Sequence, residues 1–387
     1  MDSATVPLPL APAAGARRPG TAAAPTPPPA AVARLHHLFR ASLRASRVHP
    51  LLHVMQKYRG RPSASASASA SASASASASA SAPHPATSSP FASAPAAAPS
   101  AGTAAPRSLA PEQVRRRVAE LPHLPQAAQR ALRTLRREDA SLADVASDLS
   151  CDASLTARVL RLANSPFYGV PGRVASARDA AQVLGRRTLE SVLTLAAVAG
   201  QFSGPRSKAF DAGVFWRHAL ACAITARALA RAAALDEDQA FVAGLLHDVG
   251  LLAMSVYFPA ELDALLLHAR GADTELCAVE REHALTTHAE VGAWIAAHWH
   301  FPAGVERAIA AHHAPATEPG ATAGITACVH VADAIGHALD VAHLEHELVP
   351  AVDAAAWQRV ALADEAFCVL FEETEEGVRA LSAALAL

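Results

Sequence analysis

The feature that most constrains this chain is an apolar stretch, residues 236–257, with a histidine and an aspartate side by side in its middle. Apolar residues recur there at helical spacing, which predicts a mostly buried helix over 237–256. Asp236 is a suitable N-cap for it. Within this helix lie His247 and Asp248. Because a buried carboxylate is costly unless it is paired or bound to a metal, the pair predicts a cation site with further ligands elsewhere.

Helical patterns continue through the sequence from Pro111 onward, without a convincing strand, and predict an all-α fold. The Gly204-Pro205 pair marks a boundary between two helical subdomains, 109–205 and 206–345, and residues 346–387 add a helical extension of two or three short helices. The other expected helices cover 111–120, 126–137, 142–149, 153–164, 176–184, 188–200, 209–234, 259–269, 274–283, 287–299, 302–312 and 322–339.

Residues 1–108 are rich in Ala, Pro and Ser, and 63–82 is an uninterrupted Ser-Ala repeat. Such a tract has no large side chain to bury, so it cannot offset its ordering entropy, and we expect a disordered tail. One stretch, 32–59, mixes apolar residues with arginines and predicts a short basic amphipathic helix ending near Pro50. It suggests either a weak membrane-surface or partner contact or a fortuitous pattern, and we favour the latter.

Composition excludes several classes of partner and compartment. A net charge of -2 and a pI of about 6.8 argue against nucleic acid, whose phosphates need a basic surface. No uninterrupted apolar run approaches the ~18 residues of a transmembrane segment. The five cysteines form no CxxC pair, which predicts buried free thiols in a reducing cytoplasm. They are Cys151, Cys222, Cys277, Cys328 and Cys368.

The histidines are distributed unevenly, and several fall on helical faces that otherwise have core character. None lies between His123 and His218, whereas thirteen lie from His218 onward. Each alone has an ordinary structural explanation, but together they form a mixed imidazole and carboxylate set that suits a borderline divalent ion. Ligands from several helices are typical of a metal site in a bundle core. The candidates beside His247 and Asp248 are His218, His288, His312, His313 and Asp333.

His218, His247-Asp248 and Asp333, in this order in an all-α region, resemble the H…HD…D quartet of the HD superfamily of metal-dependent phosphohydrolases. The resemblance is closer to the HDOD family, the HD-related output domains of bacterial signalling proteins, over about residues 115–345. The stretches that carry it are Leu121-Pro-His-Leu-Pro125, DASLTARVLRLANSPFYG at 152–169, Phe215-Trp-Arg-His218, AGLLHDVG at 243–250 and His288-Ala-Glu-Val-Gly292.

The HDOD resemblance implies an N-terminal helical subdomain packed on an HD-like one, and a regulatory role with protein partners or cyclic dinucleotides. It implies metal ligation by the quartet. His288, His312 and His313 match positions that extend the site toward a second metal or a phosphate in the related HD-GYP phosphodiesterases. The chain departs from those enzymes twice: Leu251 replaces a lysine, and residues 314–320 lack the Gly-Tyr-Pro segment.

Two functions are therefore open at this point. The first is a cytoplasmic signalling output or scaffold module that binds a protein partner and retains a metal site without turnover. The second is a phosphohydrolase acting on a nucleotide or cyclic dinucleotide, with His247 and Asp248 at its catalytic core. The departures from the HD-GYP pattern favour the first. The first function also allows an HD site that is only structural; where the site binds a cofactor, the expectation is a divalent ion of Fe, Mn, Zn or Mg.

Overall fold

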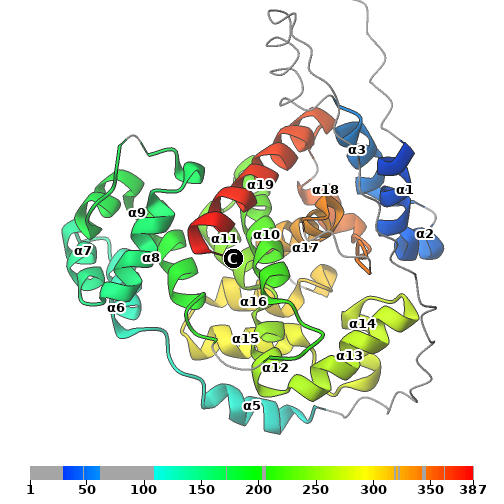
Figure 1. The fold of residues 1–387 in the computed structure, drawn as a ribbon, viewed down its shortest axis with the longest axis horizontal. Helices are drawn as coiled ribbons and strands as arrows, with labels where there is room; N and C mark the ends of the chain where they lie inside the picture. The colour runs from blue at the N-terminus through cyan, green and yellow to red at the C-terminus, as the bar shows by residue number, and fades with distance from the viewer. Residues whose placement is uncertain are drawn as a thin grey trace, which may run out of the picture.

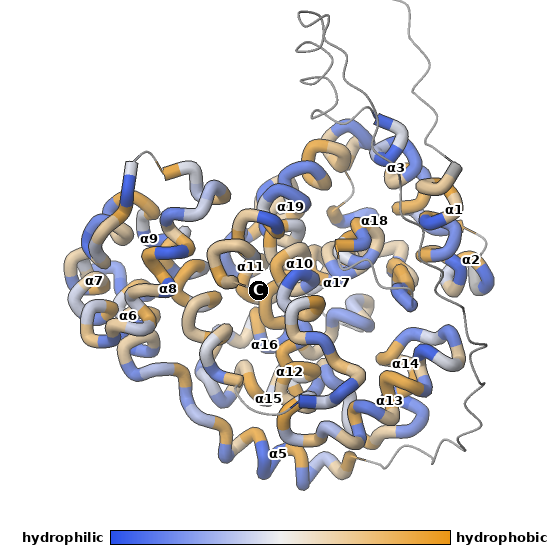
Figure 2. The backbone as a smooth tube through the Cα atoms, in the orientation of Figure 1, coloured by the Kyte–Doolittle hydropathy of each residue, from blue (hydrophilic) through white to orange (hydrophobic). Residues whose placement is uncertain are grey.

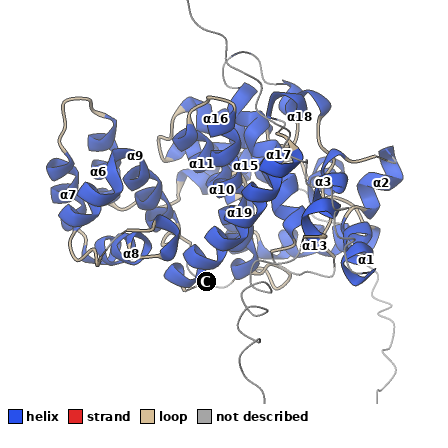
Figure 3. Cartoon of the chain, turned by 90° about the horizontal axis from the view of Figure 1, so that it is seen from above, coloured by secondary structure: helices blue, strands red, loops and turns tan. Residues whose placement is uncertain are grey.

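The structure is a computed structural model that describes residues 29–46, 48–61, 109–170, 172–202, 206–317, 320, 323–341, 346–360 and 362–386. Within these ranges the protein is helical and has no strand (Figure 3), so the all-α prediction is confirmed. The Ser-Ala repeat and the other expected disorder in 62–108 and 1–28 lie outside the described residues.

The central bundle is built around α10 (Ala212–Ala232), which packs against α11 (Glu237–Leu246), α17 (Ala323–Leu339) and α19 (Asp364–Leu385). Figure 1 shows α10 enclosed by these helices. In Figure 2, α11 is hydrophobic along most of its length, in keeping with its burial from Ala240 to Leu246. The remaining helices of this region are α12 (Val249–Tyr257), α13 (Pro259–Ala272), α14 (Leu276–His283), α15 (His288–His298) and α16 (Ala303–Ala311).

The predicted helix over 237–256 is interrupted where His247 and Asp248 lie. α11 ends at Leu246, and Asp248, with φ -103° and ψ 12°, precedes α12. The break lets two adjacent residues direct their side chains into one site. Taken together, Glu237–Tyr257 is the one described stretch long and apolar enough to cross a membrane, yet 78% of its most apolar window is buried inside the protein.

A separate group of helices forms one end of the molecule (Figure 1). It comprises α6 (Gln126–Arg136), α7 (Leu142–Ser150), α8 (Ala153–Ala163) and α9 (Ala177–Val198), which pack on one another. Gly185, with φ 70°, divides α9 into the two helical segments expected there. α5 (Pro111–Ala119) lies instead against α15 of the central bundle.

The prediction of two or three short C-terminal helices is wrong in one respect. α18 (Ala354–Val360) is short, but α19 spans 22 residues and buries Phe367, Phe371 and Leu381. Its apolar face packs along α10 and α8, and this continuous contact supports a long helix.

Within 1–108, the stretch 32–59, for which the sequence predicted a short basic helix, is helical. Three helices form there: α1 (Pro29–Leu38), α2 (Arg40–Ser46) and α3 (Pro50–Arg59). α2 ends at Ser46, near the predicted end, and Pro50 begins a further helix, as its fixed φ allows at a first helical position. Phe39 and Leu51 are fully buried. α3 packs on α19, where the Tyr58 hydroxyl donates to Glu375 over 3.0 Å.

Candidate metal centre

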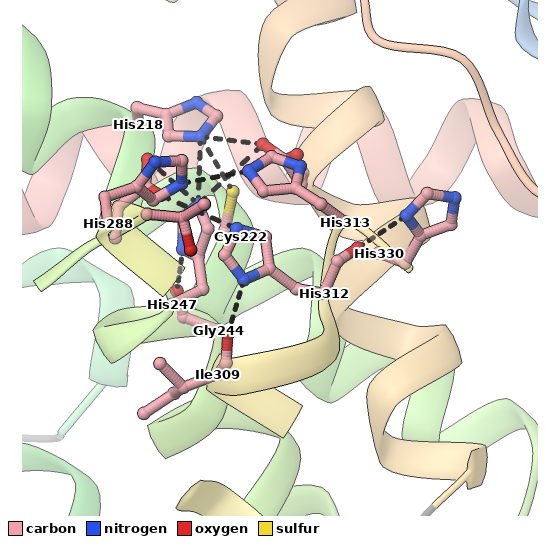
Figure 4. A network of polar contacts seen from close by, with 12 residues as sticks. His218, Cys222, Gly244, His247, His288, Ile309, His312, His313 and His330 are labelled. Carbon is pink, nitrogen blue, oxygen red and sulfur yellow. Dashed lines mark hydrogen bonds and ion pairs between the residues drawn. The ribbon is translucent and has the colours of Figure 1, made fainter. Parts of the chain in front are cut away.

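The first ligand group combines side chains of α10, α17 and the break between α11 and α12 (Figure 4). His218 Nε2 lies 3.3 Å from His247 Nε2 and 3.1 Å from Asp333 Oδ1. Cys222 Sγ lies 3.4 Å from His218 Nε2. One donor atom from each of the four residues falls within 4.8 Å of the others, and all four residues are buried. The group therefore offers two imidazoles, a carboxylate and a thiol.

The second ligand group adds α15 and the end of α16. His288 Nε2 lies 3.2 Å from Asp248 Oδ1 and 2.9 Å from His313 Nε2. His312 Nε2 lies 3.7 Å from the same oxygen of Asp248. These four donors also fall within 4.8 Å of one another. The three histidines predicted for a second metal or phosphate thus gather around one carboxylate.

Asp248 joins the two groups. Its Oδ2 is 3.3 Å from His247 Nε2 in the first group, while its Oδ1 faces the second. The structure thus brings all seven predicted site residues together but divides the expected quartet. His218, His247 and Asp333 share one group, and Asp248 belongs to the other and bridges toward it.

Three imidazoles are oriented by partners outside the groups. A carbonyl can only accept, so His247 Nδ1 donates to Gly244 O over 2.8 Å and His312 Nδ1 donates to Ile309 O over 2.7 Å. His288 Nδ1 donates to Glu280 Oε2 over 2.5 Å. This leaves Nε2 of each ring facing the shared space, as outer partners do for metal-bound histidines.

The residues present fit a metal ion. The Nε2 atom of His312 is buried, accepts no hydrogen bond among the described residues, and lies among the donors of the second group. An unpartnered buried nitrogen costs free energy unless something binds it. Imidazole, carboxylate and thiolate are together a donor set that suits Zn²⁺ or Fe²⁺ rather than Ca²⁺.

The protonation states of the centre follow from burial and neighbouring charge. Burial lowers the pKa of His312 to about 3, so this ring is neutral and able to ligate. Burial opposes the charge of His288, but the carboxylates of Glu280 and Asp248 together outweigh it and raise the pKa to about 10. At His218, burial also opposes the charge, but Cys222 and Asp333 together outweigh it, and the pKa rises to about 9. A cation must therefore displace protons from His218 and His288 when it binds.

Sequence reasoning missed four residues of this network. Cys222 and His337 each follow a predicted ligand by four positions, His218 and Asp333 respectively, so helical spacing could have revealed them. His337 Nε2 lies 3.3 Å from Asp333 Oδ1. No pattern marks the other two, Glu280 and Glu347, which contact His288 and His337 from loops and helices brought near only by folding.

A cavity of about 270 Å³ opens onto the centre. Asp248, His288, His313 and Asp333 line its inner end, whereas Cys222 is not among its lining residues. Its outer walls come from the start of α10, the α13–α14 connection and residues 346–350. Arg40 of α2 stabilises these walls by pairing with Asp273 over 2.6 Å and donating to Glu347 O over 3.0 Å. A small molecule entering the cavity would meet donors of both ligand groups.

Known proteins resemble this chain in fold and, over part of its length, in sequence. A protein of Treponema pallidum (strain Nichols), of uncharacterised function, is 30% identical over an alignment of 211 residues that covers 51% of this chain. The chain covers only 38% of that relative. An HDOD domain protein of unknown function from Geobacter sulfurreducens has a TM-score of 0.61 and 27% identity, over 71% of this chain and 98% of that one.

A second solved structure, a candidate phosphohydrolase from Shewanella amazonensis SB2B, has a TM-score of 0.55 and 27% identity. It covers 69% of this chain and 97% of its own. The family model of the HDOD domain matches residues 121–315, about half of the chain, and that range contains His218, His247 and Asp248. This protein therefore belongs to the HDOD family.

Proposed function

We propose that this HDOD protein is a metal-dependent phosphohydrolase whose centre binds divalent ions at both ligand groups. The observation that carries the proposal is that the two groups share Asp248 at the inner end of a cavity. Two-metal hydrolases hold their ions about 3.5–4 Å apart, which a carboxylate bridging two ligand groups favours. The similarity to the Shewanella candidate phosphohydrolase supports the same class.

When bound, divalent ions supply a water nucleophile near neutral pH and Lewis-acid stabilisation of phosphoryl oxygens. Asp248 holds the two ligand groups next to each other, because one of its oxygens contacts His247 and the other contacts His288. Glu280 holds His288 in one orientation by accepting from both its ring Nδ1 and its backbone N–H. Arg270 is the one Arg or Lys among the described residues that line the cavity, and it would bind a phosphoryl oxygen of the substrate.

The test is hydrolysis by the purified full chain, stripped of metal and reloaded with Mn²⁺, Fe²⁺ or Zn²⁺. Substrates would include an activated phosphodiester, nucleotides and cyclic dinucleotides. We expect activity only with metal, and loss of turnover in Asp248→Asn. The matched control is Asp236→Asn, which keeps a good helix N-cap away from the centre. A metal-loaded chain inactive on every substrate would refute the proposal.

A second candidate function is a signalling module that binds metal and a protein partner without turnover. Leu251, an apolar residue, lines the cavity where the related phosphodiesterases have a lysine, and Arg270 is the one Arg or Lys among the described residues that line it. A wall so poor in cations would stabilise a phosphoryl transition state weakly. The five free cysteines suit a reducing cytoplasm, where such signalling takes place.

The two functions differ in what Asp248→Ala changes. In an enzyme the variant loses turnover. In a metal-binding module without turnover it loses the extra thermal stability that added metal gives the wild type, because metal binding free energy contributes to folding free energy. Nucleotide binding to the metal-loaded wild type, measured by calorimetry without product formation, would favour the module.

A further inference from the structure

Cys222 occupies a position that the HD-type quartet does not explain. It lies on α10 one turn after His218 and is fully buried. Its Sγ is 3.4 Å from His218 Nε2, and Figure 4 shows the sulfur among the imidazoles of the centre. The sulfur also makes a weak contact of 3.7 Å with Ala332 O. The thiol thus faces a space shared with two histidines and a carboxylate.

Two glycines allow the neighbouring helices to pack closely around Cys222. A Cβ at Gly336 would lie 3.1 Å from His218 Nδ1 and 3.2 Å from Cys222 Sγ, so α17 approaches closely only because no side chain is there. On the other side, a Cβ at Gly244 would lie 2.8 Å from Cys222 O. Two glycines from two helices therefore fix the Cys222 position within narrow limits.

The other cysteines differ from Cys222 in their surroundings. Cys277, Cys328 and Cys368 are buried, but none joins a group of potential ligands among the described residues. Cys151 is exposed, which corrects the expectation that all five thiols are buried. Cys328 is as fully buried as Cys222 and lies on α17, so it serves as a matched control.

We propose that Cys222 is the fourth protein ligand of the first ion, beside His218, His247 and Asp333. This proposal rests on the metal centre of the proposed function, and it specifies which metal ions that centre selects. On binding, the S–H proton passes to solvent as the sulfur–metal bond forms, so no oxidant or reductant is involved. A soft thiolate in a nitrogen and oxygen set favours Zn²⁺, Fe²⁺ or Co²⁺ and disfavours Mg²⁺, which prefers oxygen ligands.

The alternative is that Cys222 acts only as a small apolar core residue, as buried free cysteines commonly do. In that case the sulfur would keep its proton and its weak contact to Ala332 O. The two possibilities differ in whether a sulfur–metal bond forms, which spectroscopy detects directly without any assay of turnover.

The experiment uses the full chain, stripped of metal and titrated with Co²⁺ as the probe. We expect the near-ultraviolet thiolate-to-Co²⁺ charge-transfer band in the wild type and in Cys328→Ser, and its absence in Cys222→Ser. We also expect the affinity of the first ion to fall by more than the roughly 10–100-fold that loss of an outer partner costs. X-ray absorption of the zinc-loaded wild type, which needs no variant, should show sulfur at about 2.3 Å.

Wild-type protein that binds Co²⁺ without the band, or Cys222→Ser that keeps it, would overturn the ligand proposal and leave the metal centre standing. The band together with no hydrolysis of any substrate would support the ligand and overturn the proposed enzyme. Folded wild type that takes up no Co²⁺ would overturn both.

Discussion

Gly250→Ala is expected to break the metal centre through one added methyl group. Gly250 lies in α12 and faces α15, where a Cβ would come within 2.0 Å of His288 O and 2.9 Å of Gly292 N. Ordinary van der Waals contact begins near 3.4 Å, so the two helices would have to separate by about 1.4 Å. The obstructing atoms are backbone, so no side chain can rotate to make room.

The magnitude follows from two opposing effects. Alanine gains about 1 kcal/mol over glycine in a helix interior. Overpacking costs about 1–3 kcal/mol and occasionally more, and a backbone clash belongs at the upper end. We expect a net loss of about 2 kcal/mol in the free energy of unfolding. Because His288 Nε2 is only 3.2 Å from Asp248 Oδ1, the same shift should also disrupt the second ligand group.

The assay is urea unfolding together with metal analysis of the reloaded protein. Gly250→Ala should lower the unfolding midpoint and lose one ion while the first group, on α10 and α17, keeps its own. Gly271→Ala is the control, since a Cβ on that α13 glycine would meet nothing within 4 Å. It should leave metal content unchanged and stability equal or up to ~1 kcal/mol higher. An unchanged midpoint and two retained ions in Gly250→Ala would refute the reasoning.

Three further predictions concern pH, orientation and the N-terminal helices. The apparent affinity for Zn²⁺ should rise with pH up to about 9–10. The pKa values of His218 and His288 are about 9 and 10, and the protonated rings that dominate below these values cannot bind a metal. Calorimetry that finds no proton release on Zn²⁺ binding at pH 7 would contradict this. Glu280→Gln should weaken metal binding about 10–100-fold, since it removes the charge that orients His288, and equal affinity by competition titration would count against it. Leu51→Ala should lower the free energy of unfolding by about 2–5 kcal/mol, because Leu51 is fully buried, and unfolding should remain a single transition. Substitution of the exposed His53 by alanine is the control. A separate early transition in Leu51→Ala would show that α3 does not unfold together with the rest of the chain.

Much of the candidate site could be predicted from the sequence because its key residues conflict with their local pattern. Burying a carboxylate in the apolar stretch between Val242 and Leu252 costs free energy unless a cation binds it, and this cost points to Asp248 as a ligand. Helical periodicity predicted the all-α class, because it needs only information from residues three and four apart. The pattern at 32–59 predicted one short basic helix, whereas the burial of the three helices found there depends on the distant α17 and α19.

The sequence by itself determined the helical class, the family and the seven candidate ligands, since these depend on residue type and spacing along one chain. Only the tertiary structure decided how the ligands divide. It assigned Asp248 to the second group as a bridge, placed Cys222 in the first, and required Gly250 where α12 meets α15. The physical reason is that donor atoms on five separate segments come within a few ångströms of one another only when helix packing fixes their distances, and no local pattern encodes those distances.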